Sequence, residues 1–169
     1  MLTGRLQTAR RWFGEAAGLS QGRLHPQHRV VLSMLATCLA QLDDPGAAQQ
    51  AVAELDALTP FTYRAGEQAI GRGWALAASG DLQGARDLLR AAAATMQDTG
   101  QFGQEAWLRH EVVRLGDAGS ERARLDELES LCEGELVPAY AFHARAATGR
   151  APGALEEAVE LFAALGANL

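Results

Sequence analysis

The chain contains no lysine, because all 15 of its basic residues are arginine. A phosphate-binding loop of the GxxxxGK type is therefore absent, since that loop needs a lysine to hold the phosphates. The nearest glycine cluster, Gly71 and Gly73, has no third glycine at position 76 and belongs to a predicted helix, which argues against a dinucleotide site. We predict that the chain holds no cofactor.

Cysteines and long apolar runs are also scarce. Cys38 and Cys132 are far apart and have no CxxC partner, so neither a disulfide framework nor a thiolate zinc site is indicated. We predict two core thiols and no metal. No apolar run approaches the ~18 residues that cross a bilayer, and the N-terminus lacks the apolar segment of a secretory signal. We expect a cytoplasmic protein without membrane contact.

The acidic balance and the lack of catalytic motifs exclude further classes. A net charge of -6 and a pI near 5.2 oppose contact with a phosphate backbone, so we predict no direct nucleic acid contact. No nucleophile elbow, HExxH or EF-hand spacing is present. The acidic pairs Asp43–Asp44 and Glu156–Glu157 fall at predicted turns or on polar faces. We predict no catalytic residues and no enzyme.

The sequence does contain an internal repeat. Residues 79–89, SGDLQGARDLL, share Gly, Leu, Gln, Ala and Arg with residues 3–13, TGRLQTARRWF, at the same spacing. Ala9, Ala48 and Ala85 each begin an apolar-periodic run, and they are 39 and 37 residues apart. A further turn at residues 115–117 reduces the period to about 34 to 39 residues. This period is typical of tetratricopeptide-like helical hairpins.

Helical periodicity predicts the fold class. Apolar residues recur at helical spacing, and no alternating run predicts a strand. We predict an all-α, tetratricopeptide-like right-handed solenoid of about nine helices, with one unpaired helix followed by four helical hairpins. It would form a single domain over residues 1–169, with approximate units 1–20, 26–59, 61–98, 101–133 and 136–166. Both ends lack capping helices, so we expect a segment of a longer protein or one whose ends meet a partner.

Turn residues support these limits. Gly80, Gly116 and Gly149 follow predicted helix ends, where a left-handed residue is favoured. Pro45 and Pro152 fall at predicted first-turn positions, where a missing N–H costs nothing.

Several segments resemble the helical-repeat region of large actinobacterial LuxR-family transcription regulators that carry an N-terminal ATPase. They are residues 51–58, 75–89, 111–117, 123–129 and 143–169, and the similarity covers nearly the whole chain from about Gly4. In that family a superhelix of degenerate repeats lies between a nucleotide-binding domain and a helix-turn-helix domain. The resemblance implies a sensor-like middle segment that binds a small-molecule effector, a protein partner or the flanking domains. This sequence has neither the phosphate-binding loop nor a helix-turn-helix domain.

The repeat register selects candidate binding residues. One column, six residues before each predicted turn, faces the concave groove in tetratricopeptide proteins, and polar residues follow it four positions later. Such a groove would bind a polar small molecule or a peptide segment. In the alternative, the tryptophan of the column packs between hairpins and its histidines are solvated or satisfied core groups. The predicted ligand-binding residues are Thr37, Gln41, Trp74, His110, Arg114 and His143. Glu67, Trp107 and Tyr140 are further candidates.

Two other features bear on partners. His25 and His28 are predicted as exposed turn residues rather than metal ligands. Arg5, Arg10 and Arg11 form a basic face on the first helix, which we expect to contact a neighbouring domain.

Two functions follow. The first is a non-catalytic ligand- or partner-binding sensor segment of a LuxR-family transcription regulator. The alternative is a stand-alone scaffold that mediates protein–protein interaction or self-association, including a homodimer formed through its end helices.

Overall fold

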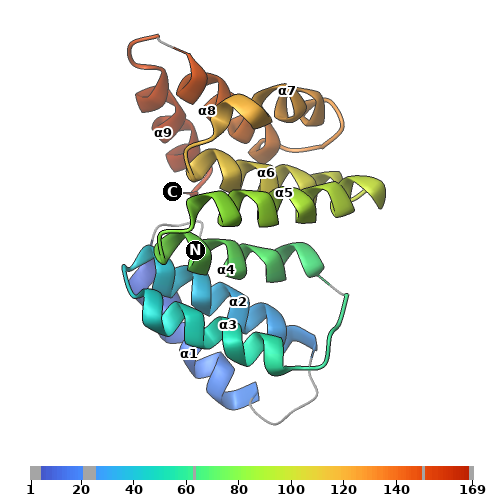
Figure 1. The fold of residues 1–169 in the computed structure, drawn as a ribbon. Helices are drawn as coiled ribbons and strands as arrows, with labels where there is room; N and C mark the ends of the chain where they lie inside the picture. Colours follow the sequence, from blue (N-terminus) through green and yellow to red (C-terminus); the bar gives the residue numbers. More distant parts are fainter. Residues whose placement is uncertain (1–4, 21–25, 63, 150, 168–169) are drawn as a thin grey trace. The chain divides into compact units, whose positions relative to one another are not determined.

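The computed structural model describes residues 5–20, 26–62, 64–149 and 151–167. The regular secondary structure of these residues is entirely helical, so the predicted all-α class is confirmed (Figure 1). The described residues form nine helices: α1 (Leu6–Ser20), α2 (Pro26–Gln41), α3 (Pro45–Ala57), α4 (Ala65–Ala78), α5 (Leu82–Asp98), α6 (Phe102–Arg114), α7 (Ala118–Glu129), α8 (Leu136–Thr148) and α9 (Ala154–Ala164). Thr3 and Gly4, which carry part of the repeat, lie outside the described residues, as does His25.

The described chain divides after Leu88 into two compact units. The division falls inside α5. The first unit contains α1 to α4 with the beginning of α5, and the second contains the rest of α5 with α6 to α9. Each unit is described by itself below.

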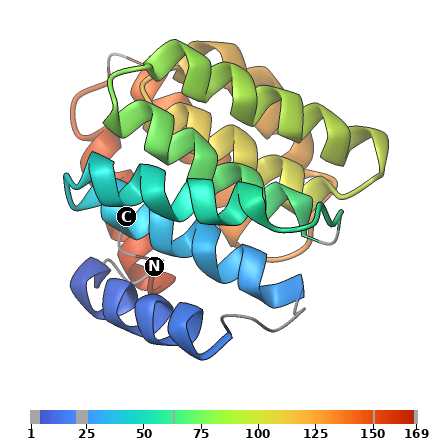
Figure 2. The ribbon, with the colours of Figure 1, turned by 60° about the horizontal axis from the view of Figure 1, so that its bottom comes forward.

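The same packing pattern occurs in both units. In the first, α2 packs against α1, α3 and α4, and α3 also packs against α4. Figure 2 shows α1, in dark blue, lying along α2. In the second, α6 packs against α7 and α8, and α8 packs against α7 and α9. The first helix of a hairpin therefore contacts its own partner and the first helix of the next hairpin, as in stacked helical repeats. A right-handed solenoid over the whole chain stays a prediction.

A recurring turn gives the sequence repeat its physical form. Gly80 (φ 93°) and Gly116 (φ 87°) are left-handed, and the amide after each donates to a carbonyl five residues earlier, at 3.0 and 3.2 Å. Asp43 takes the same conformation, with φ 61°. This is the usual way to satisfy the last carbonyls of a helix. The repeat thus encodes a helix end followed at once by a new helix.

The turn before α9 differs from the prediction. Gly149 has φ -76°, so it is not left-handed as predicted. The link between α8 and α9 is longer than the turns at Asp43, Gly80 and Gly116, and Gly153 (φ 82°) provides the left-handed residue instead. Pro152 precedes the helix, which begins at Ala154, so its predicted first-turn position is also wrong.

In the first unit, α2 and α4 approach each other closely. A Cβ on Gly71 would lie 2.4 Å from the carbonyl oxygen of Ser33 and 2.7 Å from its Cα. The Ser33 hydroxyl accepts the Gly71 amide at 2.9 Å and donates to the Glu67 carbonyl at 2.6 Å. Backbone on one side of the contact cannot move aside as a side chain would, so only glycine fits at position 71.

Arg29 of α2 closes the end of α3 from inside the first unit. It is 6% exposed, and its Nη1 donates to the carbonyls of Leu55, Leu58 and Thr59 at 3.1, 2.9 and 3.0 Å. Its Nε donates to Gln68 Oε1 of α4 at 2.7 Å. Burial, followed by the charge of Arg72, lowers the pKa of Arg29. One buried guanidinium therefore satisfies helix-end carbonyls and joins three helices.

The core of the second unit contains aromatic side chains. Its buried apolar residues come from α6 to α9 and the turn after α9, and they include an aromatic pair from α8 and α9. The members are Ala106, Val113, Ala118, Leu125, Leu128, Val137, Ala139, Tyr140, Ala141, Ala144, Phe162 and Ala167.

Candidate ligand-binding site

The six predicted ligand-binding residues fall in both units. Thr37, Gln41 and Trp74 belong to the first unit, on α2 and α4. The other three are on α6 and α8 of the second unit and are described after them.

The three residues of the first unit are largely occupied by packing. Thr37 is fully buried, and its hydroxyl donates to the Ser33 carbonyl at 2.9 Å. Trp74 is half-buried and packs against a cluster of buried alanines that includes Ala36 and Ala75. Gln41 is half-buried, and its Nε2 has no hydrogen-bond partner among the described residues. In this structure the Thr37 hydroxyl is committed to its own helix.

The two histidines of the second unit that were predicted to bind ligand form a hydrogen bond with each other. His110 of α6 is 1% exposed, and its Nε2 lies 2.9 Å from Nδ1 of the half-buried His143 of α8. One ring nitrogen donates and the other accepts, so both rings can remain neutral. His110 therefore takes the form of a satisfied core group, while ligand binding by the six residues stays a prediction.

Aromatic rings enclose this pair. The Tyr140 ring stacks on His110, with centroids 4.0 Å apart and an interplanar angle of 14°. Phe162 of α9 lies 5.5 Å from His110 and 6.0 Å from His143, centroid to centroid. The cluster therefore joins α6, α8 and α9. Tyr140, a further candidate from the sequence, belongs to it.

The electrostatics of the cluster disfavour protonation. Burial, followed by the charges of His143 and Arg114, holds the pKa of His110 well below its usual value. Burial and then Arg114 lower the pKa of His143. Arg114 Nη1 donates to Glu111 Oε2 at 2.9 Å, and Glu111 Oε1 accepts Trp107 Nε1 at 2.9 Å. At neutral pH the histidines form a neutral contact beside a charged pair.

An open pocket lies elsewhere in the second unit. Its volume is about 410 Å³, within the range of small-ligand pockets. The lining comes from the end of α7, the link after it, α8, α9 and the residue after α9, and it is mainly apolar. The lining residues are Glu129, Gly134, Glu135, Pro138, Phe142, Arg145, Leu161, Ala164 and Leu165.

Arg145 is the cation of this pocket. Its Nη1 donates to Asp126 Oδ1 at 2.6 Å and to Glu129 Oε2 at 3.0 Å, and its guanidinium carbon lies 6.0 Å from the centroid of the Phe142 ring. Burial alone would lower the pKa of Arg145, but the hydrogen bonds to Glu129 and Asp126 outweigh it and raise that pKa. The pocket therefore holds a guanidinium that is paired with two carboxylates and lies beside an aromatic face.

The sequence-based column missed these residues, although a signal for them exists. Pro138, Phe142 and Arg145 follow one another at intervals of four and three residues, which places them on one face of α8. His143 lies on another face, toward α6. The column six residues before each turn therefore selected the face of α8 that packs toward α6.

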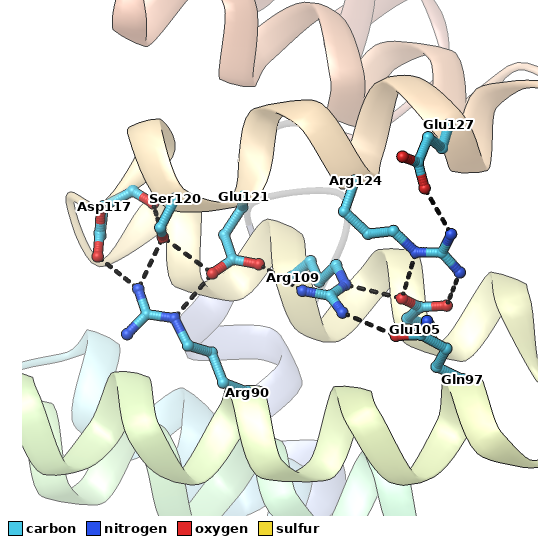
Figure 3. A network of polar contacts seen from close by, with 9 residues as sticks. All are labelled: Arg90, Gln97, Glu105, Arg109, Asp117, Ser120, Glu121, Arg124 and Glu127. Atoms are coloured by element: carbon cyan, nitrogen blue, oxygen red, sulfur yellow. Dashed lines mark hydrogen bonds and ion pairs between the residues drawn. The ribbon is translucent and has the colours of Figure 1, made fainter.

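A network of charges crosses α5, α6 and α7 (Figure 3). Glu105 is fully buried and accepts Arg109 Nε at 2.8 Å and Arg124 Nε at 2.9 Å. Glu121 is 1% exposed and accepts Arg90 Nε at 2.8 Å and Arg109 Nη1 at 2.9 Å. Arg109 therefore joins two buried carboxylates.

This network is suited to holding helices rather than to catalysis. Burial alone would raise the pKa of Glu105, but hydrogen bonds from Arg124 and Arg109 hold that pKa below its usual value. Arg90 also pairs with Asp117 at the start of α7. A carboxylate kept ionised by two guanidinium groups is a poor general acid.

The network was not predicted, but its pattern is visible in the sequence. Glu105 stands three residues before Leu108 and seven before Val112, and Glu121 stands four before Leu125. Each glutamate thus occupies a position on an apolar helix stripe, where a buried and paired charge is expected.

His28 corrects another prediction. It was predicted as an exposed turn residue, but it is 7% exposed in the first turn of α2. Its Nδ1 lies 2.7 Å from the Ser20 hydroxyl at the end of α1. The histidine is buried because α1 folds back onto α2, a contact that the local sequence does not reveal.

Three further features were sought among the described residues: a cluster of metal ligands, a reactive thiol and a membrane-spanning helix. The described residues contain no group of three or more His, Cys, Asp or Glu side chains that could hold a metal ion. Burial raises the pKa of Cys38 to about 11 and also raises that of Cys132, so both thiols are poor nucleophiles at neutral pH. None of the described helices combines the length and apolar character that crossing a bilayer requires.

Comparisons with known proteins add no relative. No protein-family model, no curated protein and no solved structure gives a significant match to this chain.

Proposed function

We propose that this chain is a non-catalytic binding segment built from helical repeats, and that its second unit holds the ligand. The observation that carries this proposal is the pocket between the end of α7, α8 and α9. It combines a mainly apolar lining with two carboxylates and one guanidinium. A ligand site typically has this composition, in which apolar area gives affinity and a few polar groups give orientation.

The chemistry of the lining indicates the class of ligand. Phe142, Leu161 and Leu165 offer apolar contact, while Arg145 and Glu129 offer one charge of each sign. A small amphiphilic molecule, with a ring or branched chain and one polar group, would use both. A peptide side chain of the same character is the alternative occupant.

The biological setting is proposed from the sequence resemblance. The segment would be the sensing region of a LuxR-family transcription regulator, in which a bound effector changes the arrangement of flanking domains. The pocket is lined from three helices and the link between α7 and α8, so an occupant would fix their relative positions. An effector can shift such an equilibrium only by its difference in affinity for the two arrangements.

A thermal-shift screen of a metabolite panel tests the proposal. A compound that occupies the pocket should raise the Tm of the chain, and at a hundred times its Kd the stabilisation should be about 2.7 kcal/mol. The shift should be lost in Phe142→Ala and in Arg145→Met. Trp74→Ala, a matched aromatic truncation in the first unit, should keep it.

Two outcomes would contradict the pocket assignment. In the first, no compound raises the Tm. In the second, a hit keeps its shift in both pocket variants and loses it in Trp74→Ala, which would return the site to the sequence-predicted groove.

A second function has its own supporting observation. A scaffold that binds another protein through its end helices is favoured by the large apolar side chains that α1 and α9 expose, among them Trp12 and Val159.

A further inference from the structure

Helices α1 and α9 each expose a pair of large apolar side chains. On α1, Trp12 is 65% exposed and Leu19 is 78% exposed. On α9, Leu155 is 49% exposed and Val159 is 67% exposed. Residues seven or four positions apart lie on the same face of a helix, so each pair forms a stripe.

Each stripe is distinct from the face that its helix packs inward. The inward face of α9 carries the buried residues Ala158 and Phe162. On α1, Phe13 is half-buried while its neighbour Trp12 is exposed. The exposed stripes are therefore additional apolar surface, and they are independent of the pocket.

The stripe on α1 is flanked by basic residues. Arg11 precedes Trp12 directly, and Arg5 stands seven residues before Trp12. The Arg5 carbonyl accepts the Ala9 amide at 2.9 Å, which places Arg5 at the start of the helix. Glu15 is the one acidic residue within α1. Glu15 lies between Trp12 and Leu19 on the stripe, but Arg5, Arg10 and Arg11 outnumber it, so the net charge around this stripe is positive.

The stripe on α9 is flanked by acidic residues. Glu156 follows Leu155, and Glu160 follows Val159, so these two glutamates lie along one edge of the stripe. Glu157 is also exposed, and α9 contains no basic residue. The surroundings of this stripe are negatively charged.

We propose that the α9 stripe of one copy of this chain binds the α1 stripe of a second copy. Burial of the four apolar side chains would supply affinity, and the glutamates of α9 beside the arginines of α1 would set partner and orientation. Pairing α9 with α9 would bring six glutamates together without a basic residue on either helix, and pairing α1 with α1 would bring arginines together. Charge therefore selects the unlike pair.

Unlike pairing has a consequence for the assembly. A contact between two different surfaces leaves one of each surface unused, so it produces closed rings or open chains rather than only dimers. Association should therefore continue beyond two copies as concentration rises.

Sedimentation velocity over a range of concentrations tests this proposal. The wild-type chain should show a weight-average mass that rises past that of a dimer. Leu155→Asp with Val159→Asp should weaken association at least about tenfold. An isologous dimer that stops at two copies, or a monomer at every concentration up to about 1 mM, would overturn the proposal.

Charge reversal gives a sharper test. Arg5→Glu with Arg11→Glu makes both stripes acidic, and Glu156→Arg with Glu160→Arg makes both basic, so each variant alone should remain monomeric. Mixed together, the two variants should associate again, because every acidic stripe then has a basic stripe on the other variant. Their net charges are both negative, so overall attraction cannot explain recovery.

A matched control carries charge reversals elsewhere. Glu54→Arg with Asp98→Arg changes two exposed acidic residues outside α1 and α9 and should leave association unchanged. A mixture of the reversed variants that stays monomeric, while circular dichroism shows both folded, would overturn the pairing of α1 with α9. An equal loss of association in the control would overturn it as well.

Discussion

The two units bring similar helical hairpins together in different ways. In the first, α2 and α4 approach until the backbone of Ser33 fills the space where Gly71 would carry a side chain. In the second, α5 and α7 of successive hairpins are joined through the buried carboxylate of Glu121, which pairs with Arg90. Arg109 of α6 links Glu121 to the second buried carboxylate, Glu105. One contact depends on a missing Cβ and the other on paired charges.

The difference shows that a repeat fixes the hairpin but not the contact between hairpins. The left-handed turn and the next helix start are common to both units, as at Gly80 and Gly116. The side chains packed between the helices differ. Buried alanines dominate a cluster of the first unit, whereas Tyr140, Phe162 and His110 contact one another in the second. The pocket also belongs to the second unit.

The largest expected effect is in the charge network. Glu105→Ala removes a fully buried carboxylate and leaves Arg109 and Arg124 without it, so we expect a loss of about 3 kcal/mol in the free energy of unfolding. Urea denaturation measures this loss. Glu127→Gln is the matched control, because Glu127 also pairs with Arg124 but its side chain is 64% exposed. It should cost less than about 0.5 kcal/mol, and equal costs would mean that burial is not what matters.

The close contact of the first unit gives the next effect. Gly71→Ala places a Cβ 2.4 Å from a backbone oxygen, so α2 and α4 must separate, at a cost of about 2 kcal/mol. Calorimetry should show a lower Tm. Gly14→Ala is the control, since nothing lies within 4 Å of its Cβ position in α1. Because alanine is the better helix former, it should raise stability by about 0.5 kcal/mol. A stabilising Gly71→Ala would contradict the close approach.

Acid should affect stability through the histidine pair of the second unit. The pKa of His110 and His143 is lowered on folding, so below pH 6.5 the unfolded chain binds more protons than the folded chain. The free energy of unfolding should therefore fall as pH decreases from 6.5 toward 5. His110→Phe keeps a ring against Tyr140 and removes one titrating group, so its slope over this window should be smaller. Urea titrations at several pH values provide the comparison, and an unchanged slope would exclude His110 as the cause.

The sequence predicted the features that depend on residues close together in the chain, and it missed those that depend on contacts between helices. Periodicity located the helices, and Gly80 and Gly116 marked their ends, because turn geometry depends on neighbouring residues. Their common repeat position placed His110 and His143 in one column, but the hydrogen bond between them was not predicted. The close approach at Gly71 and the burial of His28 depend on which helix lies opposite, and no local pattern specifies that.

The pocket escaped prediction for a related reason. A column six residues before each turn selects one face of a helix, whereas Phe142 and Arg145 line a pocket on another face. Which face of α8 stays open is decided by the position of α9, after a link whose left-handed residue is Gly153 rather than Gly149. In this turn the left-handed residue comes four positions later than predicted, whereas Gly80 and Gly116 are left-handed where the sequence placed them.

We propose that α8 and α9 of the second unit hold the ligand. Backbone amide chemical shifts of the isotope-labelled chain, recorded during titration with a compound that raises the Tm, locate the binding site directly. We expect the largest changes at Phe142, Arg145 and Leu161. Changes concentrated at Thr37, Gln41 and Trp74 of the first unit, with α8 and α9 unaffected, would contradict it.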